Sequence, residues 1–99
     1  MLDDKIILTG VEPQSGQHKS IHHELSQLLD EAPSDSCIKF KFMNEAEGPV
    51  SIIKIYSQQG QFVASISKAL EPDVSCLELC QELRKQLGKW RANRFKSPS

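Results

Sequence analysis

The chain has 99 residues, of which 38% are hydrophobic and 25% charged, and its formal net charge is −1. This length favours a single domain, and no apolar run is long enough to cross a membrane. Three cysteines at unpatterned spacing are typical of a reducing compartment. The acidic start, residues 1–4, differs from a secretory signal peptide, so we expect a cytoplasmic protein.

The near-neutral total hides a strong separation of charge. Residues 84–99 carry six Lys or Arg and no Asp or Glu, a net of +6. Residues 1–83 carry six Lys and thirteen acidic residues, a net of −7. Such asymmetry favours an anionic partner, usually nucleic acid or a membrane. The alternative is a helix end that favours cations through its dipole.

The first third of the chain predicts a strand and then a helix. Residues 5–11 form a short apolar run that ends at Glu12-Pro13, which is typical of a strand followed by a turn. Ser15 or Ser20 could cap the helix that follows. Residues 32–35 (APSD) end it. One apolar stripe of this helix comprises Ile21, Leu25, Leu28 and Leu29.

Three strands are predicted next, over residues 37–43, 50–57 and 61–68. The first and third alternate between apolar and polar side chains, and the second is rich in isoleucine. Residues 44–49 are predicted to form a polar turn. Gln58-Gln59-Gly60 predicts a hairpin turn with the glycine at positive φ.

A last helix is predicted to begin at Glu71-Pro72-Asp73, because proline and acids favour a first turn. Its apolar stripe comprises Cys76, Leu79, Cys80, Leu83, Leu87 and Trp90. The order is therefore β-α-β-β-β-α. We expect an α+β two-layer sandwich, with both helices on one face of a four-stranded mixed sheet whose first two strands are parallel. The domain would span residues 1–95, followed by a frayed tail over 96–99. The other sheet face would carry Lys39, Lys41, Lys54, Tyr56, Ser65 and Ser67.

The sequence contains no nucleophile elbow, phosphate loop or metal box, so we expect neither an enzyme nor a cofactor. His18 and His22 have the spacing that lets two imidazoles meet one metal, but further ligands are missing nearby. Cys76 and Cys80 share that spacing within the apolar stripe, where a free cysteine behaves as a small hydrophobe. No metal site is predicted.

The basic segment exceeds what a helix dipole requires, because the dipole acts only on the last turn. Six cations over sixteen residues, interleaved with amide and aromatic side chains, favour a helix that binds the phosphates of RNA.

Two stretches resemble the ribosome hibernation promoting factors, also called ribosome-associated inhibitor A or sigma-54 modulation proteins, in their short form. Residues 60–65 (GQFVAS) are similar to the family's strand after the hairpin. Residues 83–89 (LRKQLGK) resemble its pattern in the last helix. An acid at Glu71 or Asp73 stands where the family has an Asp that opens this helix.

The resemblance implies a non-enzymatic protein that binds ribosomal RNA of the small subunit and inhibits translation under stress. It also implies a monomer off the ribosome, with no membrane and no small-molecule substrate as partner. The matched helix pattern carries Arg84, Lys85 and Lys89 over as RNA-binding residues. Arg91 and Arg94 follow by continuity.

The chain departs from the family in two places. Pro72 or Val74 replaces an aromatic residue near the start of the last helix, and residues 26–31 (SQLLDE) lack the usual basic residues. These departures leave open a diverged protein with weaker ribosome affinity or an RNA-binding protein with a non-ribosomal target. A separate alternative is a protein-interaction module that uses the acidic body and basic helix. A variant ranked third places RNA on the open sheet face, through Lys39, Lys41, Lys54 and Tyr56, because a stacking platform normally uses two or three aromatic residues and this face offers one.

Overall fold

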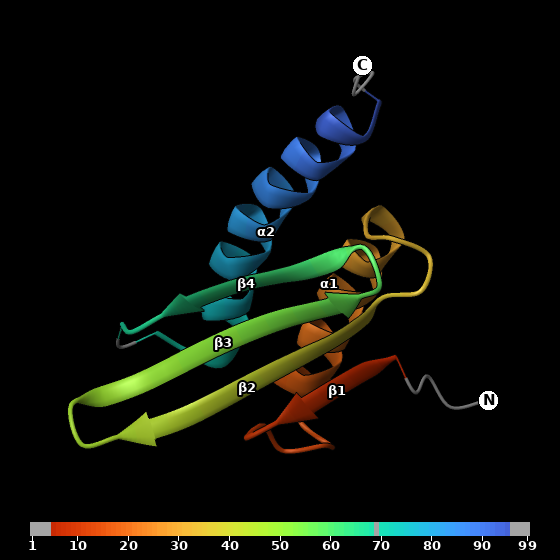
Figure 1. Cartoon of the computed structure of the whole chain (residues 1–99). Coiled ribbons are helices and arrows are strands. Elements are labelled where there is room, and N and C mark those ends of the chain that lie inside the picture. The colour runs from red at the N-terminus through yellow and green to blue at the C-terminus, as the bar shows by residue number, and fades with distance from the viewer. Residues whose placement is uncertain (1–4, 69, 96–99) are drawn as a thin grey trace.

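The computed structural model describes residues 5–68 and 70–95 (Figure 1). Its elements are β1 (Ile6–Thr9), α1 (Gly16–Glu31), β2 (Cys37–Glu45), β3 (Gly48–Ser57), β4 (Gly60–Ile66) and α2 (Pro72–Phe95). The predicted order β-α-β-β-β-α is confirmed. The acidic start at 1–4 and the predicted frayed tail at 96–99 lie outside the described residues.

The strands form one mixed sheet in the order β1-β2-β3-β4. β1 is parallel to β2, and the two hairpins β2–β3 and β3–β4 are antiparallel. Both helices lie against the same face of the sheet and leave the other face open (Figure 1). The predicted two-layer α+β sandwich is confirmed. No helix in residues 5–68 and 70–95 has the length and apolar character of a membrane span.

The core lies between the sheet and the helices, where the predicted apolar stripes meet. α1 contributes Ile21, Leu25 and Leu28. α2 contributes Cys76, Leu79, Cys80, Leu83 and Leu87. The sheet contributes Ile6, Ile38, Phe40, Ile53, Ile55, Phe62 and Ala64. Because side chains alternate along a strand, burial of Ile38 and Phe40 forces Lys39 and Lys41 onto the open face.

α1 begins at Ser15, one of the two predicted caps. The Ser15 side chain accepts a hydrogen bond from the amide of His18 at 3.0 Å, which satisfies a donor that the first turn leaves free. At the other end the amide of Ala32 donates to the carbonyl of Leu29, and Pro33 follows. Ser20 lies inside the helix, so that alternative is wrong.

The turn between β2 and β3 is shorter than predicted. Asn44 pairs with Pro49 and Glu45 pairs with Gly48, so the strands continue into the region expected as a polar turn. Gly48 has φ +124°, a conformation that glycine adopts readily and that allows so tight a reversal. The second hairpin agrees with expectation, because Gly60 has φ +143°.

β1 ends at Thr9, two residues earlier than predicted, because the chain turns sharply at Gly10. Gly10 has φ +88°, and a Cβ atom there would overlap the main-chain carbonyl of Phe42. Only glycine fits this close approach of the two backbone segments.

Candidate nucleic-acid interface

The basic half of α2 begins with Arg84, which faces α1. The Arg84 Nε atom donates a hydrogen bond to Oε2 of Glu31 at 2.9 Å, and the two side chains are 33% and 39% exposed. This hydrogen bond raises the pKa of the Arg84 guanidinium above its ordinary value. The ion pair joins the middle of α2 to the last residue of α1.

Arg91 contacts the same residue from two turns further along α2. Its guanidinium donates to the main-chain carbonyl of Glu31 at 2.7 Å. The last carbonyls of a helix have no partner within it, and a cation is favoured at that end. Arg84 and Arg91 thus hold Glu31 by its side chain and its backbone, and together they fasten the end of α1 to α2.

Lys85 and Lys89 lie on the side of α2 that faces solvent. Both are exposed, and within residues 5–68 and 70–95 neither forms an ion pair. Side chains four residues apart on a helix lie one above the other, about 5–6 Å apart at Cβ. The two lysines therefore present adjacent positive charges to an external anion.

Arg94 lies in the last turn of α2, and its side chain falls outside the described part of the chain. The end of α2 extends past the sheet (Figure 1).

A groove of about 700 Å³ opens beside this end of α2. Its lining contains two basic residues, Lys5 and Arg91, and two acidic residues, Asp30 and Glu31. Trp90 also lines it, with its ring edge-on to Phe62 at 6.2 Å between centroids. The groove was not predicted, because its residues come from distant parts of the chain and no local pattern joins them.

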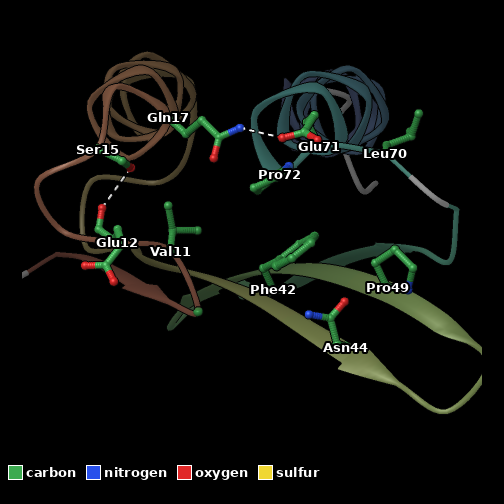
Figure 2. A pocket seen from close by; sticks show the side chains of 11 residues that line it. Val11, Glu12, Ser15, Gln17, Phe42, Asn44, Pro49, Leu70, Glu71 and Pro72 are labelled. Carbon is green, nitrogen blue, oxygen red and sulfur yellow. Dashed lines mark hydrogen bonds between the residues drawn. The ribbon is translucent and has the colours of Figure 1, made fainter.

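An acidic hollow of about 480 Å³ lies where both helices begin (Figure 2). Glu12 and Glu71 are the charged residues of its lining. Gln17 donates to Oε1 of Glu71 at 2.7 Å, and the Ser15 hydroxyl donates to the carbonyl of Glu12 at 2.9 Å. Two carboxylates disfavour an anionic ligand, so the hollow does not extend the basic surface.

The paired histidines and the paired cysteines do not gather into a metal site in the described part of the chain. His18 and His22 both lie on α1, and no three His, Cys, Asp or Glu residues of the described chain come together as a metal site. The sulfur atoms of Cys76 and Cys80 lie 3.9 Å apart in the core. The hydrogen bond with Cys80 and burial raise the pKa of the Cys76 thiol, so it stays protonated.

No protein-family model and no curated protein matches the sequence. Two solved structures share the fold. The Protein Y N-terminal domain from Thermus thermophilus has a TM-score of 0.69 at 10% identity, over 90% of this chain and 99% of that one. A ribosomal subunit interface protein from Coxiella burnetii has a TM-score of 0.69 at 16% identity, over 88% of this chain and 97% of that one. The fold that the resemblance implied is confirmed.

Proposed function

We propose that this chain is a diverged short hibernation promoting factor, a cytoplasmic protein that binds RNA of the small ribosomal subunit and inhibits translation. The observation that carries the proposal is a pair of exposed lysines, Lys85 and Lys89, which form no ion pair with any described residue and lie on the part of α2 that has no acidic residue. The fold supports it, because one neighbour of this fold is described as a ribosomal subunit interface protein.

The proposed mechanism is electrostatic and steric. The sheet and α1 hold α2 in place, and Arg84 and Arg91 fix its angle to α1 through Glu31. Lys85 and Lys89 then pair with RNA phosphates, and the body of the domain occupies space that messenger and transfer RNA need. No bond is made or broken, so the mechanism needs no catalytic group and no cofactor.

Because the two arginines bind Glu31 and the two lysines face solvent, the cations should contribute unequally to RNA binding. Each cation that neutralises a phosphate adds about −0.7 to −0.9 to the slope of log K against log salt. Lys85 and Lys89 should contribute fully. Arg84 and Arg91 are engaged with Glu31 and should contribute less, whereas Arg94 remains a proposed RNA ligand.

Sedimentation through a sucrose gradient tests the proposal. Untagged protein mixed with ribosomes should migrate with the small subunit at low salt and be released as salt rises. Protein that remains at the top of the gradient at every salt concentration would refute it.

A second candidate function is favoured by an acidic surface on the first half of α2. Val74 and Leu77 are more than two-fifths exposed there, beside the exposed Glu78 and Glu82. Such a surface suits a basic protein partner. Nuclease treatment of a lysate separates the candidates, because it removes an RNA-dependent partner and leaves a protein partner bound.

A further inference from the structure

The open face of the sheet carries a second basic surface, on the opposite side from the helices. We call it the lysine face. It is a shallow groove of about 150 Å³ on β2 and β3, lined by Lys39, Lys41, Met43, Ile52, Lys54 and Tyr56.

Two of its lysines are direct cross-strand neighbours. Lys39 on β2 pairs with Lys54 on β3, a position in which side chains lie about 4.5–5.5 Å apart at Cβ. Like charges directly opposite one another destabilise a sheet. The acidic residue of β2 on this face, Glu45, lies at the far end of the strand opposite Gly48, and within the described chain neither Lys39 nor Lys54 forms an ion pair.

Apolar side chains continue the same row on both sides. Ile7 on β1 pairs with Lys39, and Val63 on β4 pairs with Lys54. Their side chains are 49% and 45% exposed, and Tyr56 beside them is 37% exposed. The face therefore joins two adjacent positive charges to apolar contact area that extends to the outer strands.

We propose that the lysine face binds a segment of single-stranded RNA. Lys39 and Lys54 contact its phosphates, and Tyr56 stacks on one base. With a single aromatic residue, the face recognises the RNA backbone and carries little sequence preference. An acidic protein segment would satisfy the lysines but would leave Tyr56 without a stacking partner.

This inference rests on the proposed function, because it takes the RNA to be ribosomal. It adds that the domain lies between two RNA segments. Lys85 and Lys89 contact one segment on the helical side, and Lys39 and Lys54 contact the other on the sheet side.

The test uses fluorescence anisotropy with a short single-stranded RNA of mixed sequence. Lys39→Gln/Lys54→Gln is compared with Lys19→Gln/Lys68→Gln, which removes the same charge from exposed lysines elsewhere. The first variant should bind more weakly, and its slope of log K against log salt should be smaller by about 1.4. The second should match the wild type. Tyr56→Leu should lower the affinity by at least about fivefold.

Equal affinity and salt slope for the two double variants would overturn the inference. So would a lysine-face variant that loses binding to poly-glutamate and keeps its RNA affinity, because the partner would then be a protein. Failure of the proposed function has a different signature, since the wild type would not sediment with ribosomes. Thermal unfolding of each variant, expected to be cooperative, excludes misfolding as the cause.

Discussion

Arg84 donates a hydrogen bond from Nε to Oε2 of Glu31 at 2.9 Å, and this contact divides the basic end of α2 into two parts. Arg84 and Arg91 both contact Glu31 and so hold the end of α1. Lys85 and Lys89 face solvent and form no ion pair with any described residue, so an external partner can reach them. Stability and RNA binding should therefore respond to different substitutions in the same helix.

Arg84→Gln should lower the free energy of unfolding by about 0.5–1 kcal/mol, because it removes a partly exposed ion pair. Lys85→Gln, one residue away and without such a pair, should change it by less than about 0.5 kcal/mol. Urea denaturation of both variants measures the difference. Equal losses would show that the Glu31 contact contributes nothing to the stability of the domain.

Gly10→Ala should destabilise the domain by more than about 1 kcal/mol, because φ is +88° and the added Cβ would overlap Phe42. Gly88→Ala is the matched control in the middle of α2. Nothing lies within 4 Å of a Cβ there, so it should stabilise the domain by up to about 1 kcal/mol. Thermal unfolding checks both signs, and a stable Gly10→Ala variant would contradict the structure of this turn.

Cys37 should be the cysteine that reacts with a thiol reagent in the folded protein. It is exposed, whereas Cys76 and Cys80 are buried in the core. Titration with a chromogenic disulfide reagent should modify one thiol under native conditions and all three in denaturant. Rapid native modification of Cys76 or Cys80 would show that the core opens.

Lys39→Thr should raise the free energy of unfolding, by up to about 1 kcal/mol. It removes the like-charge pair with Lys54 and places a β-branched residue in a strand. Chemical denaturation measures the change, with Lys41→Thr as the control on the same strand and face, because the cross-strand neighbour of Lys41 is Ile52. A loss of stability would show that the two lysines do not repel one another.

Much of the fold could be predicted because its signals are local. The alternation of residues 37–43 and the helical stripe from Cys76 to Leu87 each depend on neighbours a few residues apart. The turn between β2 and β3 was predicted too long because its glycine and proline, Gly48 and Pro49, are paired within β3.

The candidate site was less predictable, because its geometry depends on contacts between distant segments. Helical periodicity alone places Arg84 and Arg91 beside the apolar stripe and Lys85 and Lys89 opposite it, in agreement with the structure. It gave no indication that Glu31 would receive both arginines, since that contact depends on how α1 and α2 cross. The RNA-binding role of the five cations stays a prediction.

The most direct test of the central claim is co-sedimentation of Lys85→Glu/Lys89→Glu with small ribosomal subunits at low salt. Lys19→Glu/Lys68→Glu, with the same change in net charge, is the control. We expect the first variant to lose co-sedimentation while it unfolds at the temperature of the wild type, and the control to remain bound. Undiminished co-sedimentation of Lys85→Glu/Lys89→Glu would contradict the claim that the basic end of α2 binds the ribosome.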